Sequence, residues 1–193
     1  MSIEMSIEFQ VAEVLKQVAL DEEIKEYVLQ YPSLYQPLLH AALRFIGGET
    51  LRDCVETGKL LNQQGFAITI DYMGESTRDA DMAQQATAEF LCVIEAIAEQ
   101  NLNSSVSLDL SHIGMVIDAE LGYKNACILA EAAQDTGLEM MISMEGPDRT
   151  NLILEIHQRL CETFDNVGIT LQAYLHRTPS DLAPRREAPR SVR

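Results

Sequence analysis

Short apolar runs alternate with longer stretches of helical periodicity along most of the chain. The runs are rich in β-branched residues and end at turn-forming or polar positions, which is typical of strands. Five such runs lie at residues 44–51, 66–72, 106–110, 138–144 and 167–174. Nearly apolar strands that alternate with helices predict a parallel sheet with right-handed crossovers.

The N-terminal part of the chain has a different pattern. Apolar positions in residues 5–29 recur at helical spacing within an acidic segment, which predicts one amphipathic helix. Pro32 ends this helix, because proline disfavours a helical residue before it, and a second short helix follows. We therefore expect a helical arm at residues 1–43, ahead of a β/α part at residues 44–182.

Polar side chains follow the apolar runs at the points where the strands are expected to end. The last run gives way to Gln172, and the corresponding positions of three earlier runs hold Asp71, Asp109 and Ser143. Parallel strands end at the same edge of their sheet, so we expect these side chains to lie close together. Such an edge is where β/α proteins hold polar ligands.

The spacing of the runs favours one architecture over others. No glycine-rich phosphate-binding motif follows any of the predicted strands, which disfavours the Rossmann and P-loop folds. A (β/α)8 barrel fits better, although it typically takes about 250 residues. With 193 residues and about five βα units, the chain is predicted to form an incomplete TIM-barrel-like α/β fold.

Composition narrows the range of partners. The net charge of −16 argues against a nucleic-acid partner, since phosphate binding needs clustered Lys and Arg. No apolar run approaches the roughly 20 residues that span a bilayer, and no signal peptide is visible, so a soluble cytoplasmic protein is expected.

The four cysteines and four histidines are scattered along the chain, and no metal site is predicted. The tail at 183–193, with two prolines and four arginines, is typical of a solvated end.

Five segments keep a fixed order along the chain. They are Arg44–Leu51 (RFIGGETL), Ile70–Glu75 (IDYMGE), Ser107–Gly114 (SLDLSHIG), Ile142–Glu145 (ISME) and Gly168–Thr178 (GITLQAYLHRT). In this order they resemble the motifs of the proline dehydrogenases, flavoenzymes built on a (β/α)8 barrel. Each motif alone is short and unspecific. All five in register make the resemblance specific over residues 44–182.

The resemblance implies an oxidoreductase of proline catabolism. The family oxidises L-proline to Δ1-pyrroline-5-carboxylate, with FAD as the hydride acceptor. Gln172 is similar in position to a residue that hydrogen-bonds the flavin ring, and Arg193 to a flavin neighbour at the start of the sixth strand. By the same resemblance, Asp71 and Glu75 match acidic strand-end positions on the substrate side.

Two catalytic positions depart from the family pattern. Asp109 stands where the family has a lysine that helps to hold the substrate's carboxylate, and Ser143 stands where it has an active-site aspartate. Two like charges about 4 Å apart cost roughly 1 kcal/mol in water and about 4 at an intermediate dielectric. Asp109 is therefore expected to repel a carboxylate.

Several interpretations stay open. The chain is predicted to be a proline dehydrogenase-like flavoprotein, a flavoprotein that oxidises a different amine, or a non-catalytic binding or assembly module on the same scaffold. In the last case a second copy or a partner chain covers the open edge of the sheet. Asp109 and Glu145 are either paired carboxylates for acid–base chemistry or independent strand ends.

Overall fold

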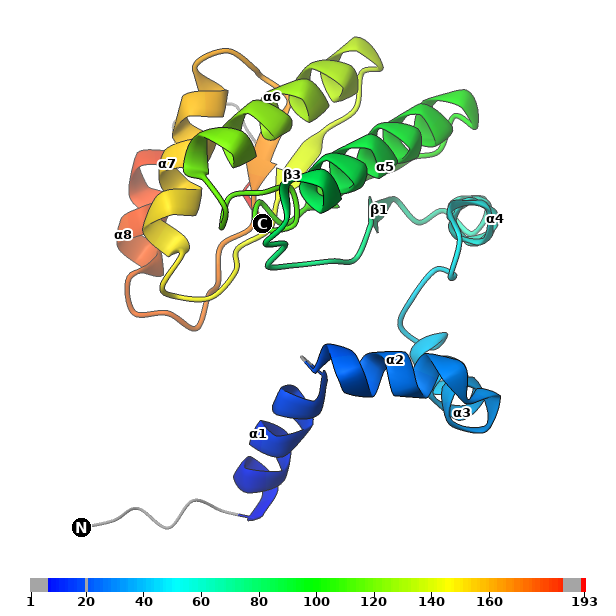
Figure 1. Cartoon of the computed structure of the whole chain (residues 1–193). Coiled ribbons are helices and arrows are strands. Elements are labelled where there is room, and N and C mark those ends of the chain that lie inside the picture. The colour runs from blue at the N-terminus through cyan, green and yellow to red at the C-terminus, as the bar shows by residue number, and fades with distance from the viewer. Residues whose placement is uncertain (1–6, 20, 186–191) are drawn as a thin grey trace, which may run out of the picture. The chain divides into compact units, whose positions relative to one another are not determined.

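The chain folds into two compact units, Met1–Glu49 and Thr50–Arg193. The structure is a computed structural model that describes residues 7–19, 21–185 and 192–193. The described part of the first unit contains helices α1 (Ile7–Ala19), α2 (Glu22–Gln30) and α3 (Pro32–Ala42) (Figure 1). Pro32 occupies the first turn of α3, where its missing N–H costs nothing.

The single helix predicted for residues 5–29 is wrong, because two helices share this segment. Asp21 caps the start of α2, and its Oδ1 accepts hydrogen bonds from the amides of Glu23 and Ile24 at 3.0 and 3.1 Å. A cap of this kind satisfies amides that have no partner within the helix, so it favours a new helix start over a continuous helix. Residues 5 and 6 lie outside the described ranges.

The strand predicted at residues 44–51 is also wrong. The amides of Phe45 and Ile46 donate to the carbonyl of Ala42 at 2.8 and 3.1 Å, so this segment continues α3 as turns. These local hydrogen bonds outweigh the weak strand preference of so short a run. Thr50 then caps α4, and its hydroxyl oxygen accepts a hydrogen bond from the amide of Asp53 at 3.2 Å.

The second unit contains the sheet, and the other four predicted strands are present in it. Three have shorter ranges, and the one predicted at residues 106–110 lies two residues earlier, at 104–108. Its elements are α4 (Leu51–Gln63), β1 (Ile68–Asp71), α5 (Ala80–Glu99), β2 (Ser104–Leu108), α6 (Ala119–Asp135), β3 (Met140–Ile142), α7 (Thr150–Cys161), β4 (Val167–Ile169), α8 (Thr178–Leu182) and a 3-10 turn at Ala183–Arg185. The strands lie in the order β1-β2-β3-β4, and every neighbouring pair is parallel. This order is the one that successive βα units produce.

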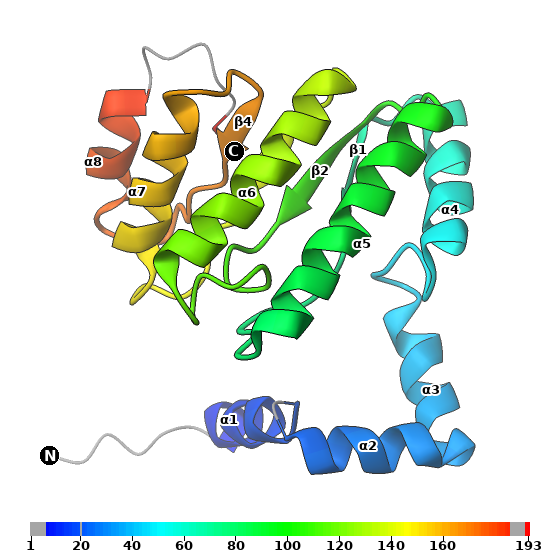
Figure 2. The same cartoon turned by 45° about the horizontal axis from the view of Figure 1, so that its top comes forward.

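Helices cover one face of this sheet. α5, α6 and α7 run side by side across it (Figure 2). The core between helices and sheet is fully buried and includes Phe90, Ile97, Leu108, Leu129, Ile142, Ile153 and Leu160. Each such side chain contributes about 1.5–3 kcal/mol through burial.

The opposite face of the sheet is polar along β1 and β2. Alternation along the strands places Thr69 and Asp71 of β1, and Ser105 and Ser107 of β2, on the face away from that core. A doubly wound fold covers both faces with helices, whereas a β/α barrel covers only its outside. The predicted TIM-barrel-like α/β class is therefore confirmed, with four strands of the barrel wall in the described residues.

The end of the chain lies beside β4. Val192 forms a parallel bridge with Ile169, and the amide of Arg193 donates to the Ile169 carbonyl at 3.0 Å. The amide of Leu171 in turn donates to the Arg193 carbonyl at 2.7 Å. These two residues hold the position of the next parallel strand.

No helix within the described ranges combines the length and the apolar character needed to cross a bilayer.

Candidate functional site

The carboxyl ends of the strands bring three of the predicted site residues to one edge of the sheet. Asp71 is the last residue of β1, Asp109 directly follows β2, and Ser143 directly follows β3. In the parallel register Asp71 lies opposite Ser107, whose hydroxyl donates to Asp71 Oδ2 at 2.8 Å. The expectation that these side chains lie close together is met by this geometry.

Asp109 lies among other carboxylates. Burial first, and then the negative charges of Glu145, Asp71 and Glu75, raise the pKa of Asp109 to about 6 against the opposing effect of a hydrogen bond from Ser143. All the charged groups that act on Asp109 are thus acidic. Glu75, predicted on the substrate side, belongs to this cluster.

His112 lies beside Asp71 and favours the neutral form. Burial lowers the pKa of His112, against the opposing effects of a hydrogen bond to the Tyr72 backbone and of the Asp71 carboxylate. Its ring packs 5.1 Å from the Tyr72 ring and 5.8 Å from the Phe90 ring, centroid to centroid. A Cβ at Gly74 would come within 2.3 Å of the imidazole, so only glycine permits this packing.

Burial also raises the pKa of Asp71, and this effect outweighs two opposing ones. The hydrogen bond from Ser107 and the nearby His112 imidazole both lower that pKa. Asp71 and Asp109 are therefore both carboxylates held partly out of water, which strengthens their interaction with any charged ligand.

A buried network that the sequence did not predict connects the loops behind this edge. Glu145, 8% exposed, accepts from the Ser111 amide at 3.0 Å through Oε1 and from the Arg149 guanidinium at 2.7 Å through Oε2. Arg149 also donates to the Ser76 hydroxyl at 3.0 Å, and the Ser76 amide donates to the Ser111 hydroxyl at 2.9 Å. The loops after β1, β2 and β3 are fixed to one another in this way.

Gln172 is held at the same edge by its amide nitrogen. Nε2 donates to the carbonyls of Glu145 at 3.0 Å and Met144 at 3.4 Å. Its Oε1 is buried and has no hydrogen-bond partner in the described part of the chain. A buried acceptor without a donor is costly, so this oxygen is a candidate contact for a bound group.

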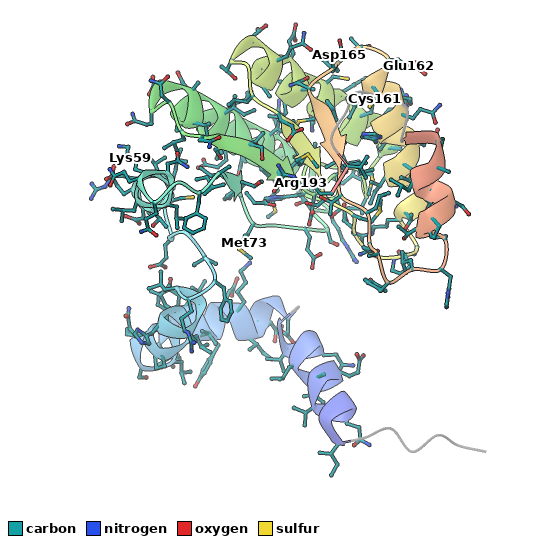
Figure 3. The ribbon with its side chains drawn as sticks, turned by 180° about the vertical axis from the view of Figure 1, so that it is seen from behind. Lys59, Met73, Cys161, Glu162, Asp165 and Arg193 are labelled. Atoms are coloured by element: carbon teal, nitrogen blue, oxygen red, sulfur yellow. The ribbon has the colours of Figure 1, made fainter. Side chains whose placement is uncertain are left out.

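The side chain of Arg193 does not reach this edge. Its guanidinium donates to the hydroxyls of Thr69 at 2.7 Å and Ser105 at 3.2 Å, and to Glu139 Oε2 at 3.3 Å (Figure 3). Thr69 and Ser105 lie opposite each other, two residues before Asp71 and Ser107. Arg193 thus lies across the polar face of the sheet, nearer to the starts of the strands than the carboxylate cluster.

The residues after Gln172 leave the sheet earlier than predicted. β4 ends at Ile169, and the amide of Leu175 donates to the Gln172 carbonyl at 3.2 Å to form a turn. Arg177 then pairs with Asp181 at 2.6 Å, one turn later along α8. The predicted strand to residue 174 is wrong, because these local bonds replace the ladder.

Comparison with known proteins gives a consistent result. The family model described as "Proline dehydrogenase" matches residues 54–191. Proline dehydrogenase 2 of Bacillus subtilis is 35% identical over 142 residues, which are 74% of this chain and 47% of that protein. Proline dehydrogenase 1 of the same organism is 34% identical over 152 residues, 79% of this chain and 50% of that protein.

Solved structures show the same fold at lower identity. Proline utilization A from Bdellovibrio bacteriovorus, inactivated by N-propargylglycine, superposes with a TM-score of 0.72 at 17% identity, over 82% of this chain and 20% of that one. A mutant of proline utilization A from Bradyrhizobium japonicum gives a TM-score of 0.58 at 22% identity, over 75% of this chain and 17% of that one.

This chain spans about half the length of the curated relatives it matches. The family model covers residues 54–191, which are most of the chain. The matched range includes the strand-end carboxylates, the Glu145 network and Gln172. The chain belongs to the proline dehydrogenase family.

Proposed function

We propose that this chain is a proline dehydrogenase-like flavoprotein that takes part in the oxidation of L-proline to 1-pyrroline-5-carboxylate, with FAD as the oxidant. Membership of the family supports the reaction. The observation that carries the proposal for this chain is the buried, unpartnered Oε1 of Gln172 at the edge where the strands end.

Gln172 fits a flavin chemically. The polar edge of the flavin ring carries both hydrogen-bond donors and acceptors, and Gln172 still has an acceptor to offer. Held by Gln172, FAD would supply the hydride acceptor for the oxidation of the carbon beside the substrate nitrogen. Arg193 is the second proposed cofactor contact, because it is a permanent cation with five donors. Its guanidinium, which donates to Thr69, Ser105 and Glu139 in this structure, would turn toward the strand-end edge to contact the flavin.

The remaining site residues take roles around the substrate. We assign Asp71 and Glu75 to the substrate side and Asp109 and Ser143 to the catalytic positions. Glu145, through its bonds to Ser111 and Arg149, acts as a positioning residue that fixes the loops behind these groups. A site held by such a network keeps its side chains in one geometry.

Addition of L-proline to the FAD-loaded protein, in the absence of oxygen, tests the reaction. We expect the absorbance of oxidised flavin to bleach, because the hydride of the C–H bond beside the substrate nitrogen passes to the flavin while the nitrogen loses a proton and the C=N bond forms. Free FAD with L-proline is the control and stays oxidised. A protein that retains FAD but keeps the oxidised spectrum after L-proline is added contradicts the proposal.

A second role, as an assembly module, is favoured by one feature of the sheet. β1 pairs with β2 only, and its other edge has no strand partner in the described ranges. An unpaired edge is a template for another strand, from a second copy or a partner chain. In that role the chain takes up FAD only together with its partner, whereas in the proposed function it takes up FAD alone.

A further inference from the structure

Carboxylates outnumber cations at the edge where the strands end. Three carboxylates, Glu145, Asp71 and Glu75, act on Asp109, and within the described ranges only Glu145 of these has a cationic partner, Arg149. The guanidinium of Arg149 is engaged by Glu145 at 2.7 Å and by Ser76 at 3.0 Å. Such an edge attracts a positive ligand and repels a negative one.

A second observation, independent of the charge, points to a ligand with N–H donors. His112 is 8% exposed, and its Nδ1 is buried without a hydrogen-bond partner among the residues that the structure describes. Its ring interacts with the Tyr72 backbone, and Nε2 is the nitrogen left to donate to that carbonyl. Nδ1 of the neutral ring is then an unused acceptor, on a residue that interacts electrostatically with Asp71.

These features together describe a receptor for an ammonium group. The positive charge of an ammonium can pair with the carboxylates of Asp71 and Asp109. An ammonium also has more than one N–H to donate. A carboxylate has neither, and it meets like charges at this edge. A zwitterion such as proline can approach only with its nitrogen end toward these two residues.

We propose that Asp71 and Asp109, with Nδ1 of His112, recognise the protonated nitrogen of a cyclic secondary amine, so that the substrate class is set by the amine and does not require a carboxylate. This inference rests on the proposed function, because it names the substrate class of the same site. It places the ammonium at the ends of β1 and β2.

Three five-membered-ring probes separate the two ends of the substrate. Pyrrolidine has the amine and no carboxylate, tetrahydrofuran-2-carboxylate has the carboxylate and no amine, and L-proline has both. Each is titrated by calorimetry into the chain with and without FAD, so that binding is measured apart from turnover. We expect pyrrolidine to bind at least fivefold more tightly than tetrahydrofuran-2-carboxylate.

Variants locate the binding on the proposed residues. Asp109→Asn and, separately, Asp71→Asn should each weaken pyrrolidine binding at least fivefold, because the charge is lost while the shape is kept. Asp135→Asn, at the exposed end of α6, is the matched control and should leave the binding unchanged. Two substitutions are used so that a folding defect in one does not decide the result.

The outcomes distinguish this inference from the proposed function. Equal or tighter binding of tetrahydrofuran-2-carboxylate, no measurable binding of pyrrolidine, or pyrrolidine binding that survives both substitutions overturns the inference. A protein whose flavin is reduced by L-proline, but which binds the carboxylate probe best, retains the proposed function and loses only the inference. Pyrrolidine binding by a chain that takes up no FAD overturns the proposed function and supports the inference.

Discussion

Replacement of Glu145 by alanine lowers the free energy of unfolding by about 3 kcal/mol. The Glu145 side chain is 3% exposed and pairs with Arg149, whose side chain is 27% exposed. Removal of the carboxylate leaves the Ser111 amide buried without an acceptor, which costs about 1–3 kcal/mol. It also leaves a partly buried guanidinium without its counter-charge, and the two losses act together.

Urea denaturation of Glu145→Ala beside wild type measures this loss. Glu131→Ala, at an exposed position of α6, is the matched control, and its free energy of unfolding should stay within about 0.5 kcal/mol of wild type. Glu145→Gln should fall between the two, because an amide keeps one acceptor but loses the charge. A Glu145→Ala protein as stable as the control contradicts the role of this network.

Replacement of Asp109 by asparagine raises the free energy of unfolding by about 1.5 kcal/mol at pH 7.5. The pKa of Asp109 is raised to about 6 from its ordinary 3.8, first by burial and then by neighbouring carboxylates. The difference between these values corresponds to about 3 kcal/mol, and solvent screening at this half-buried side chain reduces it to about half. Asparagine removes the charge and can still accept the hydrogen bond of Ser143.

The gain from Asp109→Asn depends on pH in a defined direction. An aspartate whose pKa is higher in the folded chain binds its proton more tightly when folded, so its charge destabilises the fold at pH values above 6. This cost is relieved as the pH falls through 6 toward 3.8. The variant and wild type should therefore converge in stability near pH 4.

Thermal or urea unfolding at pH 7.5 and pH 4.5 provides this comparison. Only the difference between variant and wild type is interpreted, since other carboxylates titrate in the same range. Asp135→Asn, which changes an exposed carboxylate, should show no gain at either pH. A gain that is the same at both pH values, or a loss at pH 7.5, contradicts the assigned environment of Asp109.

The order of helices and strands was predictable from the sequence, because burial of one face gives each element a regular spacing of apolar positions. The apolar runs around Ile70, Val106, Met140 and Val167 became strands, since their side chains pack against the helices. The errors lie where local bonds decide the backbone. Asp21 starts a helix inside an apolar pattern, and this depends on one side-chain cap.

The candidate site was predictable to the same extent. Asp71, Asp109 and Ser143 were found because parallel strands end at one edge, which is a property of the topology. The bonds of Arg149 and Ser76 were not, because they depend on loop conformation. Ser76 has φ of 56°, which no local sequence pattern at this position indicates.

The position of the Arg193 guanidinium was not predictable either. The resemblance assigned this residue to the flavin, and its backbone does lie beside β4, near the expected strand. Its long side chain, however, reaches back to Thr69, Ser105 and Glu139. Its direction follows from hydroxyls and a carboxylate contributed by other strands, which become neighbours only in the folded sheet.

Titration with FAD, followed by flavin fluorescence and absorbance, tests the proposed function most directly. We predict saturable binding to wild type, at least fivefold weaker binding to Gln172→Ala, and unchanged binding to Gln134→Ala, whose side chain is exposed on α6. Loss of binding in the first variant alone places the flavin at the strand-end edge. No saturable change with wild type, in a protein that unfolds cooperatively, contradicts the proposal that this chain is a flavoprotein.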